Sequence, residues 1–225
     1  MSDTDSFINE VNEEVRRDRL YGYLRRYGWI GVLLVVLIVG GAAWTEYRKA
    51  VARNEAQALG DGMLAALSAT NAEDRAAALS GLGADDPTAQ ALVSMLRASS
   101  AQEAGDIEAA VAALNAVAVN GEVNPIYRQI ASFKALTLQA DTLDADSRRQ
   151  QFEALAAPGG AMRLLALEQL ALMDVAAGET DAAIAGYQDI LRDAAVTPDL
   201  QQRALQVIVA LGGEPDLDNL PTTGN

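Results

Sequence analysis

Asp141, Asp144 and Asp146 form a group of side chains that could bind a cation, because carboxylate oxygens are the ligands that calcium prefers. A calcium loop also needs a glycine at its sixth position and a bidentate glutamate at its twelfth. Counted from Asp141, those two positions hold Asp146 and Phe152. The spacing therefore favours a solvated turn, and we expect no metal site here.

Other chemistry is limited by composition, since the sequence contains no cysteine and no histidine. This removes thiolate nucleophiles, histidine bases and the usual zinc ligands. The neighbouring acids in Glu13-Glu14 and Asp85-Asp86 point to different faces of a helix or cap its start. Gly81-Leu82-Gly83 lacks the lysine and hydroxyl residue of a phosphate loop. The sequence therefore predicts a protein that is not an enzyme and has no cofactor.

The net charge of −14 is carried mainly by residues 45–225, which hold 12 Lys and Arg against 25 Asp and Glu. A domain this acidic is repelled by nucleic-acid phosphates, so we expect no nucleic-acid partner. The acidity favours a role in solubility over a specific basic partner.

An uncharged run from residue 28 to 44, GWIGVLLVVLIVGGAAW, is flanked by Trp29 and Trp44. Its length as a helix is about 25 Å, at the short end of what a bilayer core requires. Tryptophan favours the headgroup zone, so both rings are expected to act as membrane anchors. We predict one transmembrane helix over 28–45. A cleaved signal peptide, with Gly41-Ala42-Ala43 as its cleavage site, is the weaker alternative, because the acidic leader is a poor signal start.

Basic residues predict the orientation of this span. Five arginines precede it and three basic residues follow it, which favours a cytoplasmic N-terminus and an external C-terminal domain. Residues 1–27 are predicted to form an amphipathic cytoplasmic leader helix, with apolar residues at Phe7, Val11 and Val15. This leader is either a docking helix or only a charged segment that fixes the topology.

The predicted soluble domain, residues 46–211, reads as helices joined by short turns. Alanine makes up roughly a fifth of the chain and is the strongest helix former. Asp86-Pro87, Asn124-Pro125 and Thr197-Pro198 each place a capping side chain before a proline that suits the first helical position. No segment is typical of a strand, so we predict an all-α fold.

A repeat organises these helices. Ala98, Ala135 and Ala171 recur at intervals of 37 and 36 residues. Around the first and last of these alanines, a turn glycine, a second small residue and a large apolar residue follow at matching offsets: Gly105, Ala110 and Leu114; Gly178, Ala183 and Tyr187. Small residues suit close helix crossings, and large ones fill the neighbouring groove. The pattern predicts an α-solenoid of degenerate tetratricopeptide-like helical hairpins.

The copies differ in quality. The best runs from Leu167 to Ala194, while the middle copy has Thr142 where the turn glycine is expected. Leu200–Leu211 is predicted to be a capping helix, and residues 212–225 a disordered tail.

The leader FINEVNEEVRRDRLYGYLRRYGW, the single span and hairpins ending in RALQVIVALGG together resemble the YfgM-type tetratricopeptide-like family. That resemblance implies a bacterial inner-membrane protein whose domain faces the periplasm. It also implies an ancillary subunit of the SecYEG translocon that works with a membrane-bound periplasmic chaperone of the prolyl-isomerase class on exported proteins.

The predicted function is therefore a membrane-anchored scaffold for protein binding in protein translocation. A scaffold for another envelope assembly, such as cytochrome c maturation, and a self-associating structural anchor are the alternatives. The sequence leaves the client and the oligomeric state open.

Overall fold

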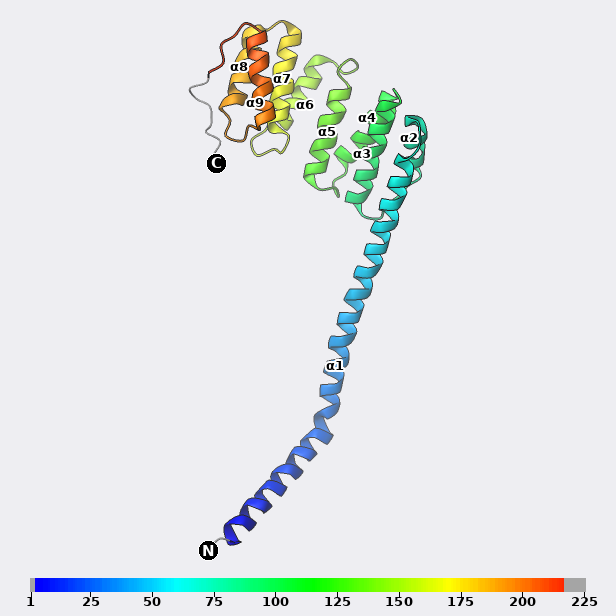
Figure 1. The fold of residues 1–225 in the computed structure, drawn as a ribbon, viewed down its shortest axis with the longest axis vertical. Coiled ribbons are helices and arrows are strands. Elements are labelled where there is room, and N and C mark those ends of the chain that lie inside the picture. Colours follow the sequence, from blue (N-terminus) through cyan, green and yellow to red (C-terminus); the bar gives the residue numbers. More distant parts are fainter. Residues whose placement is uncertain (1–2, 217–225) are drawn as a thin grey trace. The chain divides into compact units, whose positions relative to one another are not determined.

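A computed structural model describes residues 3–216, with side chains at 25–26 and 29–216 (Figure 1). Within the described residues the chain is all-helical, with nine α-helices and no strand. Two compact units make up the chain, Met1–Gly60 (unit 1) and Asp61–Asn225 (unit 2). The all-α prediction is thereby confirmed for the part of the chain described.

Unit 1 contains most of helix α1, which runs from Asp3 to Leu67 without a break. The predicted membrane span and the segment after it therefore form one helix, because no proline interrupts the backbone hydrogen bonds there. The apolar face predicted for the leader, at Phe7, Val11 and Val15, lies outside the described side chains.

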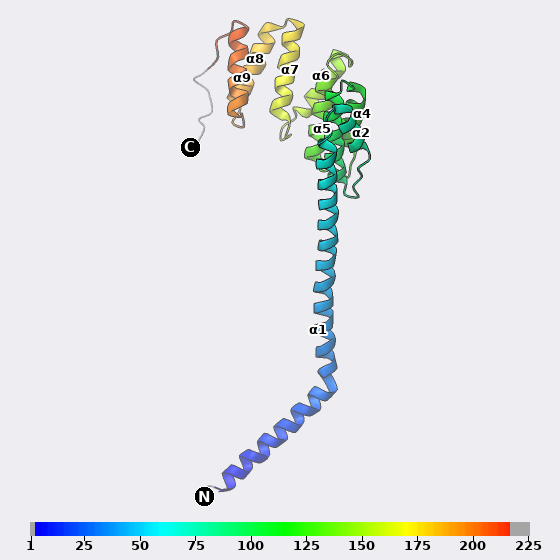
Figure 2. The same ribbon diagram turned by 45° about the vertical axis from the view of Figure 1, so that its right-hand side comes forward.

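Unit 2 holds the end of α1 and eight further helices, in which each helix from α2 onward packs on the next (Figures 1 and 2). The helices are α2 (Ala72–Ser80), α3 (Pro87–Glu103), α4 (Ile107–Val119), α5 (Pro125–Leu138), α6 (Ala145–Leu155), α7 (Arg163–Ala177), α8 (Thr180–Arg192) and α9 (Pro198–Ala210). Short connections allow this order, because they bring consecutive helices back alongside each other.

The predicted proline-started helices are confirmed. The side chains of Asp86, Asn124 and Thr197 accept hydrogen bonds from backbone N–H groups at the starts of α3, α5 and α9. In each helix a proline follows the capping residue. An N–H group at that position would have no acceptor within the helix, so the proline costs no hydrogen bond.

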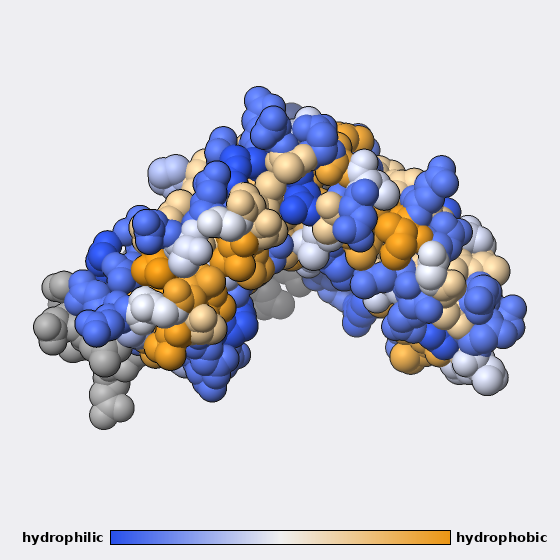
Figure 3. Space-filling view, turned by 90° about the horizontal axis from the view of Figure 1, so that it is seen from above, coloured by the Kyte–Doolittle hydropathy of each residue, from blue (hydrophilic) through white to orange (hydrophobic). Residues whose placement is uncertain are grey.

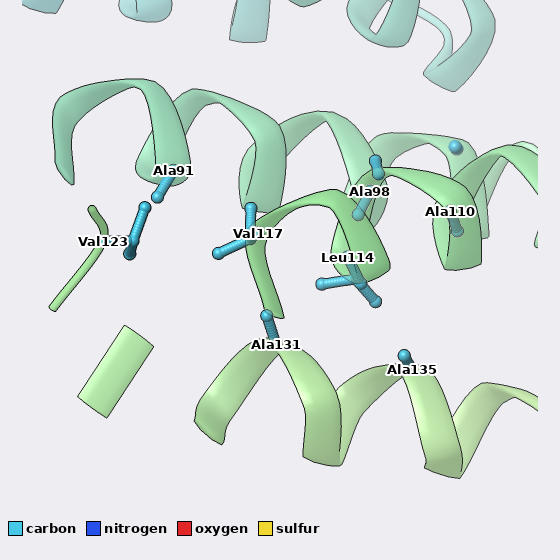
Figure 4. Close-up of a cluster of buried hydrophobic side chains, with 10 residues drawn as sticks. Ala91, Ala98, Ala110, Leu114, Val117, Val123, Ala131 and Ala135 are labelled. Atoms are coloured by element: carbon cyan, nitrogen blue, oxygen red, sulfur yellow. The ribbon is translucent and has the colours of Figure 1, made fainter. Parts of the chain in front are cut away.

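Three clusters of buried apolar side chains form the core of unit 2. The first joins α3, α4 and α5 through small residues and Leu114, and Figure 4 shows Leu114 between Ala98 and Ala135. The second joins α7, α8 and α9 around Tyr187. The third is centred on Phe152 of α6 and includes residues of α5 and α7. Each cluster thus joins three consecutive helices.

The first residues of the predicted disordered tail, 212–216, contact the helices that precede them. Leu211 is the C-cap of α9, and Gly212 follows it with φ +81. A Cβ on Gly213 would lie 3.0 Å from Ile184 and 3.1 Å from Ile208. The Gln188 side chain donates a hydrogen bond of 3.1 Å to the Glu214 carbonyl. Residues 212–216 therefore lie against α8 and α9, because two glycines allow the chain to turn back there. Residues 217–225 lie outside the described residues.

Candidate functional site

The candidate membrane segment lies on α1 and is uncovered in unit 1. Trp29, Trp44 and the large apolar side chains between them are exposed. Among the described residues, one helical segment is long and apolar enough to cross a membrane, and it runs from Trp29 to Leu67. Its uncharged part ends at Thr45. An apolar surface of this length is costly in water, so it requires lipid or protein around it.

The C-terminal end of this apolar segment has the chemistry of a membrane interface. The rings of Trp44 and Tyr47 lie 6.2 Å apart, and the Thr45 hydroxyl donates to the Ala42 carbonyl at 2.8 Å. Immediately beyond, Lys49 Nζ pairs with Glu46 at 3.0 Å. Aromatic side chains followed by charged ones match the change from hydrocarbon to headgroups to water.

In unit 2 the structure places the predicted repeat residues at buried helix crossings. Ala98, Ala135 and Ala171 are buried on α3, α5 and α7. On the following helices, Ala110 and Ala183 are each 0% exposed. A methyl side chain at such a position lets two helix backbones approach closely.

The turn glycines end the first helix of two hairpins. Gly105 has φ +80 and Gly178 has φ +77, a conformation that costs residues with a Cβ about 1 kcal/mol or more. After each glycine the next N–H bonds back into the preceding helix: Asp106 to the Ala101 carbonyl and Glu179 to the Asp174 carbonyl, both at 2.9 Å. Each glycine thus fixes the angle at which the second helix begins.

The middle hairpin, α5–α6, has neither of these features. Its turn contains no residue of positive φ, and α6 begins after Asp144, whose side chain accepts from the Ser147 N–H at 2.8 Å. Asp144 therefore serves as a helix cap, and Asp141 and Asp146 are exposed beside it. Hydrogen bonds donated by Ser147 lower the pKa of Asp144 from its ordinary value.

Sequence reasoning missed Phe152, the side chain that fills the middle hairpin. Phe152 lies eight residues after its helix cap, as Leu114 lies after Asp106 and Tyr187 after Glu179. All three side chains are at most 1% exposed, and the ring of Phe133 packs against that of Phe152 at 5.8 Å. The position of Phe152 can be predicted from the sequence if residues are counted from the helix cap instead of from Ala135.

Ion pairs between separate helices add polar links that the sequence pattern did not indicate. Arg75 pairs with Glu103. Arg149 pairs with Asp174 at 2.6 Å, Arg163 with Asp193 at 2.7 Å and Arg203 with Glu168 at 2.8 Å. Partly buried pairs of this kind are screened less by salt than exposed ones, so they help fix the register of neighbouring helices.

These links and the surrounding burial shift several pKa values. The hydrogen bond to Asp174 raises the pKa of Arg149, and the one to Glu168 raises that of Arg203. Hydrogen bonding from the Ala195 N–H, reinforced by Arg163, lowers the pKa of Asp193. Burial raises the pKa of Tyr187 to about 12, with the Glu168 charge adding to the rise.

The surface of unit 2 combines polar coverage with separate apolar patches (Figure 3). Among its exposed large apolar side chains, Leu92 is on α3 and Leu172 on α7, each 40% exposed. Within the described residues no group of three or more Asp, Glu, His or Cys side chains is placed to hold a metal ion.

Over residues 3–216, fold and site together define an all-helical protein with one helix long and apolar enough to span a membrane, followed by a unit of sequentially packed helices. Comparisons with protein-family models, curated proteins and solved structures find no match to this chain.

Proposed function

We propose that this protein is a membrane-anchored scaffold whose unit 2 binds other proteins through a tetratricopeptide-like helical array. The observation that carries the proposal is the joint occurrence of an uncovered apolar helix and a unit of consecutive helical hairpins. The anchor keeps the array beside the bilayer and so raises its effective concentration near integral membrane partners.

Two hairpins support the tetratricopeptide-like interpretation most directly. In α3–α4 and α7–α8, a buried alanine, a glycine of positive φ, a second buried alanine and a large buried side chain follow at the same offsets. In such an array the first helices of successive hairpins line one surface, which holds an extended segment or a helix of a partner. Leu92 and Leu172 lie on first helices and are the contact residues we expect to matter.

The proposed location is a bacterial inner membrane, with a cytoplasmic N-terminus and unit 2 in the periplasm. Arg16, Arg17, Arg19, Arg25 and Arg26 precede the span, whereas Arg48, Lys49 and Arg53 follow it. The excess of basic charge before the span supports this orientation.

The proposed partners are the SecYEG translocon and a membrane-bound periplasmic chaperone, with exported proteins as clients. The support is the resemblance of the leader, span and hairpins to the YfgM-type family. The absence of cysteine and histidine from the sequence supports a binding role over an enzymatic one. Unit 2 would then hold or hand over chains as they emerge.

Photocrosslinking in intact membranes tests these partners. A photoreactive amino acid replaces Leu92 or Leu172, and matched controls carry it at Ala116 of α4 or Ala185 of α8, which are also exposed. We expect translocon subunits, the chaperone or exported chains to be crosslinked from the first two positions and much less from the controls. Equal crosslinking from all four positions, or recovery of only another envelope assembly, would contradict the proposal.

A further inference from the structure

The α5–α6 hairpin departs from the other two hairpins at the position where the helices cross. The fourth residue after the helix cap is Ala110 in α4 and Ala183 in α8, and in α6 the same position holds Arg148. Both alanines are fully buried, whereas Arg148 is half-buried. An arginine therefore stands where the neighbouring hairpins need a methyl group.

The turn before α6 is also longer by one residue. From Ala98 to the cap Asp106, and from Ala171 to the cap Glu179, the separation is eight residues, whereas Ala135 and the cap Asp144 are nine residues apart. The arginine and the longer turn act in the same direction, because both keep α6 away from α5. Accordingly, α6 packs less extensively on α5 than α4 does on α3 or α8 on α7.

Buried polar groups without a partner occur on both α5 and α6. Among the described residues, Arg128 Nε on α5 and Arg148 Nε on α6 are buried and have no hydrogen-bond partner. A buried donor without a partner disfavours the state that buries it, and water can satisfy that donor when the helices separate. The local chemistry therefore favours opening at this hairpin.

On either side of α6, three consecutive helices share a core cluster of their own. One core cluster joins α3, α4 and α5, and another joins α7, α8 and α9. Helix α6 itself is strongly polar, and Phe152 is its single buried side chain. The third core cluster bridges these two groups of helices through Leu136 of α5, Phe152 of α6 and Met173 of α7. Polar links are the Arg149–Asp174 pair and a 3.1 Å hydrogen bond from the Ala161 N–H to Gln129. The packing of α6 on α5 is the least extensive between consecutive helices from α2 to α9.

We infer that α6 is a joint in unit 2, about which the body α2–α5 and the body α7–α9 change their relative orientation, and that Arg148 keeps this joint loose. The third core cluster, centred on Phe152, keeps α6 in contact with both bodies during this motion. A solenoid with such a joint adjusts the curvature of its surface to partners of different size, since packed helices move as rigid bodies about a weak interface. The inference concerns the fold, and it holds whichever partner unit 2 binds.

Pairs of spin labels test the joint in the full chain in lipid nanodiscs, and no native cysteine has to be removed. One pair spans the joint, Ala116→Cys with Ala185→Cys. Two control pairs stay inside one body each, Ala77→Cys with Ala116→Cys and Ala185→Cys with Ala210→Cys; all four alanines are exposed. We expect the distance distribution across the joint to be roughly twofold wider than either control. Equal widths would overturn the inference.

The role of Arg148 is tested by Arg148→Ala, which restores the residue type of the other two hairpins. We expect this variant to narrow the cross-joint distribution and to slow hydrogen exchange of the α6 amides roughly tenfold. Arg97→Ala is the matched control, since it removes an exposed arginine from α3, and it should change neither readout. A distribution that stays wide in Arg148→Ala would overturn the role of Arg148. If that variant does not fold, the comparison of pairs in the native protein still decides whether the joint exists.

Discussion

Arg203 on α9 holds both carboxylate oxygens of Glu168 on α7, with Nε–Oε1 at 2.8 Å and Nη2–Oε2 at 2.9 Å. These two helices are separated in the sequence by the whole of α8. The Glu168 side chain is only 11% exposed, whereas that of Arg203 is half exposed. The pair therefore ties α7 to α9 beside the second core cluster, with the buried ring of Tyr187 in its electrostatic field.

Removing the cation should be more damaging than removing both charges. Arg203→Ala leaves the buried Glu168 carboxylate without its partner, and we expect a loss of about 2 kcal/mol in the free energy of unfolding. The double variant Glu168→Met/Arg203→Met should recover most of that loss, because no buried charge remains. Denaturant unfolding of the full chain in detergent, followed by circular dichroism, measures both.

The control for this pair is Arg192→Ala, whose closer partner Asp189 is well exposed and whose second partner Asp216 lies 3.7 Å away and is partly exposed. Surface pairs contribute little, so this change should stay within about 0.5 kcal/mol. Equal losses in Arg203→Ala and Arg192→Ala would show that the burial of Glu168 has no energetic consequence.

The raised pKa of Tyr187 predicts that the folded protein loses stability in alkaline solution. Its pKa is raised from 10.0 to about 12 in the folded protein, chiefly by burial, so the folded state holds the phenolic proton more tightly than the unfolded state. The contribution of Tyr187 is therefore fully present below pH 10 and is lost as the pH rises to about 12. We expect about 2 kcal/mol of the free energy of unfolding to disappear over this window.

Tyr187→Phe isolates that contribution, because it keeps the buried ring and removes the titrating hydroxyl. Between pH 10 and about 12, the free energy of unfolding should decrease less with rising pH for this variant than for the native chain. Parallel curves for the two proteins would contradict the assignment.

Replacing either turn glycine by alanine should destabilise the protein through backbone strain alone. No atom lies within 4 Å of a Cβ placed on Gly105 or Gly178, yet both have positive φ. Gly105→Ala and Gly178→Ala should each lower the free energy of unfolding by about 1 kcal/mol. Gly121→Ala is the matched control, since it has equal space and no positive φ, and thermal unfolding should place it close to the native protein.

Membrane insertion of α1 should require that the middle of its apolar part carries no charge. Leu34→Arg places a charge where lipid is expected, at a cost of about 3 kcal/mol, and should shift protein from the carbonate-resistant membrane fraction to the soluble fraction. Leu64→Arg adds the same charge to an exposed position of unit 2 and should leave the membrane fraction unchanged. Retention of both variants in membranes would argue against this span.

The proposed orientation predicts the side from which protease reaches unit 2. Protease added to intact spheroplasts should digest unit 2 and spare an N-terminal fragment that contains the span. A cytoplasmic marker protein should stay intact in the same sample. Protection of unit 2 until the membrane is lysed would place it in the cytoplasm.

Local signals in the sequence predicted the helices well. Asp86-Pro87, Asn124-Pro125 and Thr197-Pro198 mark helix starts because a side-chain acceptor and a fixed φ act within three residues of each other. The long uncharged run between Trp29 and Trp44 is equally local, since hydropathy alone identifies it.

Features that depend on long-range contact were not predictable in the same way. Glu168 and Arg203 are 35 residues apart, and no periodicity distinguishes them from other charged residues of unit 2. Arg148 was missed because the repeat was counted from Ala135, and the extra residue in the turn shifts that count by one. Residues 212–216 were predicted as a disordered tail because their glycines and acids are typical of tails, whereas contacts with α8 and α9 hold them.

The outward side of α9 restricts how an array of this type can be lengthened. Besides one large apolar side chain, Val209, its exposed residues there include the polar Asp199, Gln202 and Gln206. A hairpin stacked directly on that side would have to strip water from these groups without replacing their hydrogen bonds. Engineers who want a longer array should therefore insert new hairpins ahead of α9 and leave this helix as the last one.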